Sequence, residues 1–329
     1  MALLEIEELR VEIDTPDGPA AILDGLDLAL ERGRSLGLVG ESGCGKSMTA
    51  LAVMGLLPGA ARASGAIRLE DQNLLELSEA ALCGLRGRRI SMIFQEPMTA
   101  LNPVTAIGQQ VAEGLRRHLR LDRREAWSRA AALLDRVGLP PARFPLSLYP
   151  HQLSGGQRQR VMIAAAMACG PDLLIADEPT TALDVTIQAQ VLDLIAGLVE
   201  EEGLALLLIT HDLGVVAEMA DRVAVMYSGR IVESGPADAV FAQMAHPYAR
   251  GLFAAMPQVP SDSEEKAQRL GRLATIPGRV PAPLERPAGC AFAPRCALRA
   301  PACAEEPPIE ALAEGHWVRC LRPQREPLP

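Results

Sequence analysis

The octapeptide GESGCGKS, residues 40 to 47, has the residue types and spacing of a phosphate-binding loop. Its three glycines, Gly40, Gly43 and Gly45, allow backbone amides to turn inward around phosphate oxygens. Lys46 offers a positive charge to the β- and γ-phosphates, and Ser47 offers a hydroxyl ligand for Mg²⁺. The loop predicts binding of a nucleoside triphosphate with Mg²⁺. The alternative, a plain glycine turn before a helix, is disfavoured by the segments that follow it.

Two carboxylates and a histidine come directly after apolar segments farther along the chain. LLIA leads into Asp177 and Glu178, and LLLIT leads into His211. We expect Asp177 to hold Mg²⁺ through water, Glu178 to act as general base on the attacking water, and His211 to reach the γ-phosphate. Without a phosphate-binding loop, two such acids are more often a solvated loop, and a lone histidine is more often structural.

A second anion site is predicted at LSGGQ, residues 153 to 157. Ser154 is a favourable helix N-cap, and Gly155 and Gly156 leave backbone N–H groups bare at the positive end of the following helix. Gln157 completes the segment. One chain with one nucleotide has no use for two anion sites. We therefore expect two chains placed head to tail, with this helix of each chain closing on the phosphate held by the other.

The elements that must position these residues alternate between strands and helices. Strand-like patterns at LLEIEELRVEI, SLGLVG, DLLIAD and LALLLIT are separated by helical segments such as MTALAVMGLL and VTIQAQVLDLIAGLVEEEG. This order predicts an α/β fold with a parallel sheet covered on both faces. Residues from about 98 to 160 have a charged helical pattern and predict an inserted helical subdomain.

The composition is that of a globular protein without a strong basic field. Hydrophobic residues make up 49% of the chain, charged residues 22%, and the net charge is −9, so we expect no nucleic-acid partner. Glu5, Glu7 and Glu8 stand where a secretory signal would have basic residues and an apolar run, which favours a cytoplasmic protein. The apolar stretches are too short or too interrupted to span a bilayer.

The segments GESGCGKS, FQEP, LSGGQ, LLIADEP, TALD and ITHD together resemble the motif set of the ATP-binding-cassette (ABC) ATPases over residues 1 to about 250. The resemblance implies a P-loop NTPase core with a helical signature subdomain, and it implies ATP hydrolysis. It also implies that Gln95 senses Mg²⁺ and couples to a membrane partner, and that Asp184 communicates across a dimer. Ser47, Gln95 and Asp177 are the implied Mg²⁺ ligands. The catalytic residues expected are Glu178, His211, Lys46 and Gln95, and the nucleotide-binding residues are Gly40, Glu41, Ser42, Gly43, Cys44, Gly45, Lys46, Ser47, Met48, Gln95, Ser154, Gly155, Gly156, Gln157, Asp177, Asp184 and Ile13.

Two of these positions depart from the family's usual pattern. Ile13 stands where the family stacks adenine on an aromatic side chain, so we expect apolar contact with the base in place of stacking. Cys44 stands where serine is common, and its side chain is small enough to fit.

The stretch HPYARGL, residues 246 to 252, followed by a proline-rich, cysteine-bearing tail resembles the ATPase subunits of oligopeptide, dipeptide and nickel importers. This implies a nucleotide-binding domain over 1–253, an extension over 254–329, and a place on the cytoplasmic face of the inner membrane. The implied partners are a second ATPase subunit, identical or homologous, two transmembrane permease subunits and an extracytoplasmic solute-binding protein. Di- or oligopeptides are the expected cargo. Nickel, glutathione or another small solute is the alternative, and an ABC ATPase acting on DNA or ribosomes is a distant one.

Four of the seven cysteines lie close together near the C-terminus: Cys290, Cys296, Cys303 and Cys320. A reducing cytoplasm disfavours disulfides, and zinc sites usually have closer cysteine pairs than these. Four thiolates suit a [4Fe–4S] cluster, and some of the related importer ATPases hold one in this tail. We expect such a cluster, with zinc and reduced thiols as alternatives. The proline-rich stretch before it, residues 256 to 289, looks like a linker or a loosely structured appendage. We expect His316 to be a surface histidine rather than a substitute ligand.

Overall fold

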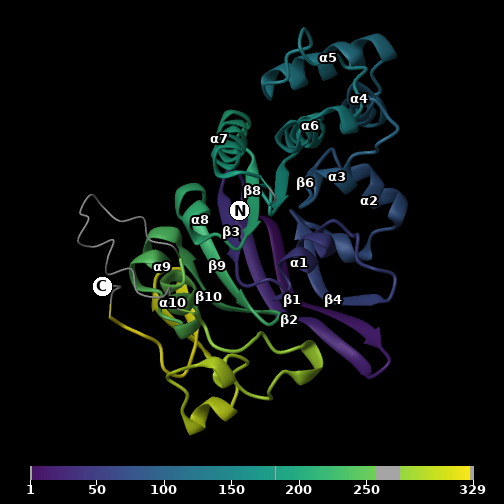
Figure 1. Cartoon of the computed structure of the whole chain (residues 1–329). Helices are drawn as coiled ribbons and strands as arrows, with labels where there is room; N and C mark the ends of the chain where they lie inside the picture. Colours follow the sequence, from purple (N-terminus) through teal and green to yellow (C-terminus); the bar gives the residue numbers. More distant parts are fainter. Residues whose placement is uncertain (1, 182, 257–274, 327–329) are drawn as a thin grey trace, which may run out of the picture.

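The computed structural model describes residues 2–181, 183–256 and 275–326. Strands form two sheets, and helices lie on their faces and above one edge (Figure 1). The strands are β1 (Ala2–Thr15), β2 (Gly18–Glu31), β3 (Ser35–Val39), β4 (Ala61–Leu69), β5 (Gln72–Asn73), β6 (Ile90–Ile93), β7 (Leu173–Asp177), β8 (Ala205–Thr210), β9 (Arg222–Tyr227), β10 (Arg230–Pro236), β11 (Ile309–Ala313) and β12 (His316–Arg319). The helices are α1 (Lys46–Val53), α2 (Glu79–Leu85), α3 (Pro97–Ala100), α4 (Ile107–His118), α5 (Arg123–Arg136), α6 (Gly155–Met167), α7 (Val185–Glu202), α8 (Leu213–Met219), α9 (Ala237–Gln243) and α10 (Pro247–Ala254).

The larger sheet has eight strands in the order β11-β12-β10-β9-β3-β8-β7-β6. The five strands from β9 to β6 are parallel neighbours, and β10, β12 and β11 continue the sheet antiparallel at one edge. Every residue of β7 and β8 is buried, as expected for parallel strands covered on both faces. The predicted α/β fold is therefore confirmed.

Successive side chains of β8 pack alternately into two different hydrophobic cores. Leu206 and Leu208 pack into the core that contains α7 and α8, whereas Leu207 and Ile209 pack into the core that contains α1. The second core is closed by the smaller sheet, which is antiparallel with strand order β2-β1-β4-β5. Figure 1 shows α8 on one side of the central strands and α1 on the other. The parallel sheet is thus covered by a hydrophobic core on each of its two faces.

Helix α1 differs from the helix predicted over MTALAVMGLL. It begins at Lys46, inside the phosphate-binding loop, and ends at Val53 rather than at Leu57. The early end follows from Gly55, whose φ of 62° is left-handed and incompatible with continuing a right-handed helix. Within the residues that the model describes, no helix is both long and apolar enough to cross a bilayer.

Helices α4, α5 and α6 form a helical layer beyond one end of the larger sheet, at the top of Figure 1. Apolar residues at helical spacing on α4, namely Ile107, Val111 and Leu115, share a core with Ala126 and Leu134 of α5. Helix α6 contacts α4, α5 and β6, so it joins the layer to the sheet. The subdomain boundaries at about 98 and 160 remain a prediction.

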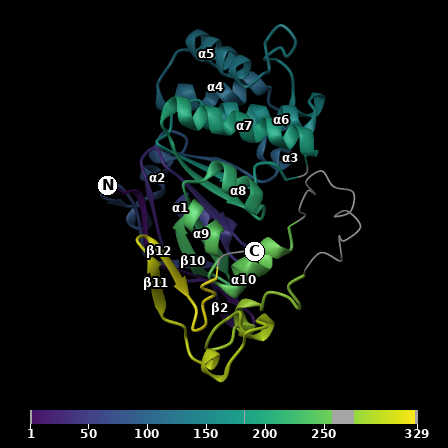
Figure 2. The same ribbon diagram turned by 90° about the vertical axis from the view of Figure 1, so that its left-hand side faces the viewer.

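The C-terminal extension adds two strands to the edge of the larger sheet. Strand β12 pairs with β10, and Figure 2 shows the β11–β12 hairpin beside β10 at the edge of the sheet. Phe292 is 4% exposed and lies edge-on to Tyr227, with 5.2 Å between ring centroids. The interpretation of the proline-rich stretch from residue 256 to 289 as a linker or loosely structured appendage is wrong for its described part, residues 275–289, because Ile276 and Val280 pack against the core and Arg286 bonds to Asp24. Residues 257–274 lie outside the described part of the chain.

His316 is buried, not on the surface. Its side chain is 2% exposed, and Nε2 lies 3.0 Å from Oε1 of Glu233, which is fully buried on β10. Glu233 also accepts hydrogen bonds from the backbone N–H groups of Ala245 and His246. The expectation of a surface histidine is wrong because β12 packs against β10, a pairing that local sequence does not reveal.

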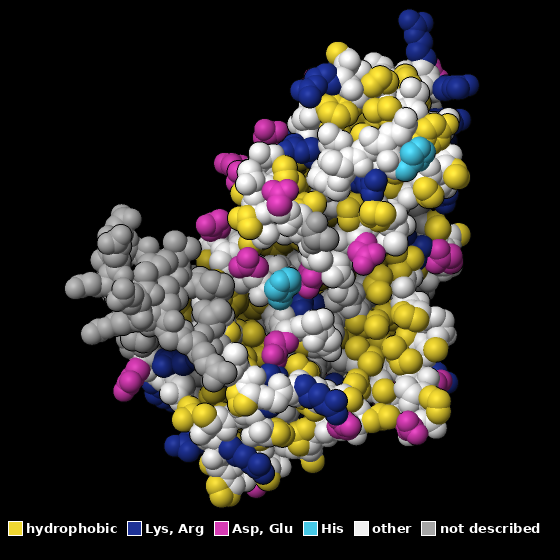
Figure 3. Space-filling view, viewed as in Figure 1, with side chains coloured by type: hydrophobic (Ala, Val, Ile, Leu, Met, Phe, Trp, Pro, Cys, Tyr) yellow, Lys and Arg dark blue, Asp and Glu magenta, His cyan; other side chains and the backbone are white. Residues whose placement is uncertain are grey.

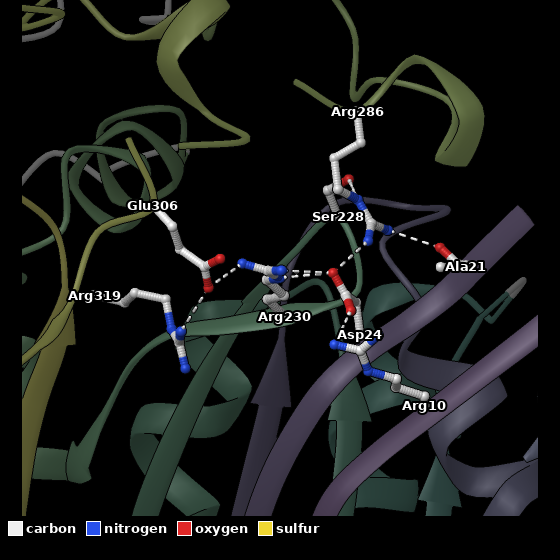
Figure 4. Close-up of polar contacts among 8 residues, drawn as sticks. All are labelled: Arg10, Ala21, Asp24, Ser228, Arg230, Arg286, Glu306 and Arg319. Atoms are coloured by element: carbon white, nitrogen blue, oxygen red, sulfur yellow. Dashed lines mark hydrogen bonds and ion pairs between the residues drawn. The ribbon is translucent and has the colours of Figure 1, made fainter. Parts of the chain in front are cut away.

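A network of arginines around Asp24 joins the extension to β2 and β10 (Figure 4). Asp24 accepts from Arg230 at 2.6 Å and from Arg286 of the extension at 3.3 Å, and Arg10 lies 3.3 Å away. Arg230 also bonds to Glu306 of the extension at 2.6 Å. Burial acts to raise the pKa of Asp24, but the three arginines outweigh it and lower that pKa. The carboxylate is thus a shared anchor for three elements.

Replacing Asp24 with alanine should weaken the attachment of the extension. The change leaves Arg230 and Arg286 half-buried without their shared acid, which we expect to cost about 2 kcal/mol and about 5 °C of melting temperature. Asp14→Ala is the matched control, because its ion pair with Arg62 is exposed on both sides and should matter little. Equal melting temperatures for the two variants, measured by differential scanning calorimetry, would contradict the anchoring role.

Candidate active site

The carboxyl ends of four parallel strands meet at one edge of the larger sheet. Strand β3 ends at Val39 and leads into residues 40–47, and β6, β7 and β8 end just before Gln95, Glu178 and His211. Because parallel strands end at the same edge, the topology brings these four segments together, which is where α/β folds bind ligands.

Residues 40–47 pass so close to neighbouring segments that side chains are excluded at two positions. A Cβ on Gly40 would lie 2.3 Å from the carbonyl oxygen of Met226, and Gly45 has a φ of 113° and abuts Leu23. Lys46 is 4% exposed, and its Nζ donates to the carbonyl oxygens of Gly40 at 2.8 Å and Glu41 at 3.1 Å. The loop thus has the tight turn of a phosphate-binding loop, with its amine held by loop carbonyls.

The other loop residues differ in exposure. Ser42 and Gly43 are exposed at the tip, whereas Cys44 is 1% exposed beneath it. Burial raises the pKa of the Cys44 thiol, and nearby Lys46 offsets this only in part. Met48 is partly buried and packs against the α1 core. The cysteine fits as a small buried side chain, and Met48 contributes to packing.

Ser47 and Asp177 form an oxygen pair suited to Mg²⁺. The Ser47 hydroxyl donates to Oδ1 of Asp177 across 3.1 Å. Asp177 is 4% exposed, so burial raises its pKa, and the neighbouring Glu178 acts in the same direction. A divalent cation would relieve both effects by compensating the buried charge. Hydroxyl and carboxylate oxygens are the donors that Mg²⁺ prefers, so this pair fits the ion.

Glu178 stands at the centre of a polar cluster. It accepts hydrogen bonds from Gln95 Nε2 at 3.1 Å and from Thr181 Oγ1 at 2.9 Å, and His211 Nδ1 lies 3.4 Å from its Oε1. Its φ is 45°, a left-handed conformation that is uncommon for a non-glycine residue and clusters at functional sites. The fold therefore brings the predicted base, glutamine and histidine into one group, and it adds Thr181, which sequence reasoning missed.

The LSGGQ segment caps α6. Ser154 accepts from the N–H of Gln157 while the Gln157 side chain accepts from the N–H of Ser154, which completes a capping box. Ser154 and Gly155 are exposed, and a Cβ on Gly156 would lie 2.6 Å from a methyl of Ile187 on α7. Asp184 caps α7 by accepting from Ile187 N–H at 3.0 Å. Two helix N-termini therefore lie next to each other.

An open hollow of about 680 Å³ lies at these two helix ends. Its lining includes Ser154, Gly155, Gly156 and Asp184, and no residue of the 40–47 loop. The predicted second anion site is thus separate from the phosphate-binding loop of the same chain.

Ile13 lies near the end of β1, opposite Ala20 of β2 and Ala61 of β4, and is half-buried. The same β1–β2 hairpin reaches the loop through Leu23, which contacts Gly45. Contact of Ile13 with a base remains a prediction.

The four C-terminal cysteines line one small cavity of about 10 Å³ together with Phe292. Burial raises the pKa of Cys290 and Cys296, and it raises that of Cys320 to about 11. Within the described residues, however, no three or more His, Cys, Asp or Glu side chains form a group that could hold a metal ion. The fold gathers the four thiols but does not arrange them as a metal site.

Comparison with known proteins identifies the family. Residues 23–181 match the model of the ABC transporter family, and residues 232–303 match that of the oligopeptide/dipeptide transporter C-terminal region. The oligopeptide transport ATP-binding protein OppD of Salmonella typhimurium is 47% identical over 98% of this chain and 95% of its own. The chain belongs to the ABC transporter ATPases. As a member of this ATPase family, the cassette binds and hydrolyses ATP.

A second relative is similar to the chain over nearly its full length, and two solved structures are similar to it over about seven tenths of its length. A protein of Brucella abortus, provisionally named a peptide import ATP-binding protein, is 50% identical to the cassette over 97% of both chains. Among solved structures, the dimeric post-hydrolysis state of the ATP-binding cassette MJ0796 with ADP and Pi is 26% identical, with a TM-score of 0.64, over 71% of this chain and 98% of that one. The cbiO1 protein of Clostridium perfringens, part of the ABC transporter complex cbiONQ, is 29% identical with a TM-score of 0.60, over 73% of this chain and 90% of that one.

Proposed function

We propose that the cassette is the ATP-hydrolysing subunit of an importer of di- or oligopeptides. The observation that carries this proposal is the match of residues 232–303 to the oligopeptide/dipeptide transporter C-terminal region, in the same chain as the ABC transporter match over residues 23–181. The names of two full-length relatives, which refer to peptide import and oligopeptide transport, support the same cargo class.

In this proposal each part of the site has one task in hydrolysis. Lys46 leaves the loop carbonyls to bind the β- and γ-phosphates, and Glu178 takes a proton from the attacking water. His211 and Gln95, both within reach of Glu178, orient the water and the γ-phosphate. Ser47, Asp177 and Gln95 would hold Mg²⁺, which would supply positive charge to offset that of the phosphates.

The second half of each site comes from another chain. The exposed N-terminus of α6 and the hollow beside it are suited to the γ-phosphate held by a partner's loop. ATP binding then draws two ATPase subunits together, and hydrolysis releases them. The partner subunit is identical or homologous. The MJ0796 neighbour, a dimer with ADP and Pi, supports this arrangement.

The membrane partners in this proposal are two permease subunits, with an extracytoplasmic solute-binding protein delivering the cargo. The cassette itself sits on the cytoplasmic face of the inner membrane. Met98 and Val104, next to the Gln95 segment, are 69% and 81% exposed, and hydrophobic side chains are visible on the helical layer in Figure 3. Exposed apolar residues at this place are suited to a permease helix.

The transport proposal is tested with the cassette reconstituted in proteoliposomes with its permease pair and solute-binding protein. We expect di- or tripeptides to stimulate ATP hydrolysis. When the cassette and MgATP are enclosed in the lumen, the peptides should accumulate there. Stimulation by nickel chelates or glutathione alone would transfer the assignment to another cargo of the same importer group. Failure of every solute to stimulate would overturn the importer assignment and would direct attention to ribosome or DNA binding.

We also propose that Cys290, Cys296, Cys303 and Cys320 hold a [4Fe–4S] cluster, with zinc as the alternative. The support is their convergence on one cavity, and the thiols would have to turn toward one another to bind it. After anaerobic purification we expect iron and sulfide in the protein, and Cys303→Ser should lose both while Cys169→Ser, at a half-buried thiol outside the tail, should not. A full zinc complement without iron, or neither metal, would overturn the cluster assignment.

A further inference from the structure

A side chain of the C-terminal extension reaches the phosphate-binding loop. Arg295, in the short 3₁₀ turn Ala293–Arg295, donates to both carboxylate oxygens of Glu41, with Nη1–Oε2 at 2.6 Å and Nη2–Oε1 at 2.9 Å. The Arg295 side chain is 5% exposed. A bidentate guanidinium–carboxylate pair of this kind is among the strongest and most directional polar contacts in proteins. The extension is therefore in direct contact with the nucleotide site.

Glu41 is fixed on three sides. Its side chain is held by Arg295, its backbone N–H donates to the hydroxyl of Tyr248 on α10 at 2.7 Å, and its carbonyl oxygen accepts from Lys46 at 3.1 Å. The position of the Glu41 backbone thus determines where one partner of the Lys46 amine lies.

The charge of Glu41 makes its pairing necessary. A free carboxylate in the second position of a phosphate-binding loop would repel the triphosphate. The Arg295 guanidinium offsets that charge, and the hydrogen bonds to Glu41 raise the pKa of Arg295, so the guanidinium stays positive. Nucleotide therefore meets a neutral pair in place of an acid.

Arg295 is itself anchored. Its Nε donates to the carbonyl oxygen of Pro277 at 2.8 Å, and its guanidinium carbon lies 5.8 Å from the ring centroid of Tyr227. Phe292, three residues earlier, is buried against Tyr227 and Tyr248. The arginine is thus held rigidly enough to hold Glu41 in turn.

We propose that Arg295 is a positioning residue for nucleotide binding: it neutralises Glu41 and fixes the loop that carries Lys46. The role concerns ATP and not cargo, so it does not depend on the peptide assignment and can be tested on the cassette without its permease. A residue of this kind makes ATP affinity depend on the docked extension.

The test compares charge-matched variants of the full chain. We expect Arg295→Gln to raise the KM for MgATP by about tenfold and to change kcat little, because the chemical groups around Glu178 are untouched. Arg279→Gln, an exposed arginine of the same extension with 87% of its side chain accessible, should leave KM unchanged. The double variant Glu41→Gln, Arg295→Gln removes both charges and should restore KM to within about threefold of the parent.

Three outcomes would overturn the proposal. They are a KM for Arg295→Gln equal to that of Arg279→Gln, a loss confined to kcat, or a double variant as impaired as Arg295→Gln alone. If Arg295→Gln does not yield folded protein by circular dichroism, the comparison is made in the Glu41→Gln background. There Arg295 has no carboxylate to hold, so Glu41→Gln with and without Arg295→Gln should have the same Kd for MgATP by calorimetry. A weaker Kd in the double variant would show that Arg295 acts by another route.

Discussion

Glu178→Gln should abolish turnover while leaving nucleotide binding intact. Glutamine keeps the size and hydrogen bonding of the side chain beside Gln95 and His211 but cannot take a proton from water. Loss of a general base lowers a rate by roughly 10²–10⁴-fold. We therefore expect kcat to fall by about that factor in a phosphate-release assay, with the Kd for MgATP unchanged.

The control for this experiment is Glu200→Gln, at an exposed glutamate on α7 away from the site. It makes the same chemical change and should retain the parent rate. If Glu178→Gln hydrolyses ATP as fast as Glu200→Gln, Glu178 is not the base, and water activation has to be assigned to another group.

Gly155→Asp should also abolish hydrolysis, but from the other half of the composite site. A Cβ on Gly155 lies 3.6 Å from Leu183, an ordinary contact, so the substitution is sterically tolerated, unlike one at Gly156. The new carboxylate would stand at the exposed N-terminus of α6 and repel the γ-phosphate of a partner chain. We expect a loss of about 100-fold or more in kcat, by the scale of removing one charge-stabilising group.

MgATP binding to residues 40–47 of the same chain distinguishes a defect in the two-chain site from a general loss of folding or binding. The Gly155→Asp cassette should bind MgATP as a monomer with the parent Kd, and it should fail to dimerise with ATP in size-exclusion chromatography. Gly197→Asp adds the same charge on α7, where a Cβ meets nothing within 4 Å, and it should retain both MgATP binding and ATP-driven dimerisation. ATP-driven dimerisation of Gly155→Asp would refute the proposed role of this helix.

The sequence alone was sufficient to predict the core fold. Strands β7 and β8 are continuous apolar runs, and such runs followed by acids or a histidine place polar groups at the carboxyl edge of a parallel sheet. The spacing of residues 40–47 is likewise contiguous in the chain, although the atoms that exclude a Cβ at Gly40 and Gly45 belong to Met226 and Leu23. The strands and the loop spacing could be predicted because the residues that form each of them are contiguous in the chain.

Only the tertiary structure decided which residues of the core the C-terminal extension contacts. Arg295 and Glu41 are 254 residues apart, and Arg286 and Asp24 are 262 apart, so no periodicity links them. Burial of His316 and the convergence of the four cysteines likewise depend on β12 pairing with β10. A charged side chain carries the same local signal whether it is solvated or paired. Its partner is chosen when apolar packing, here Phe292 against Tyr227 and Tyr248, brings distant segments together and removes them from water.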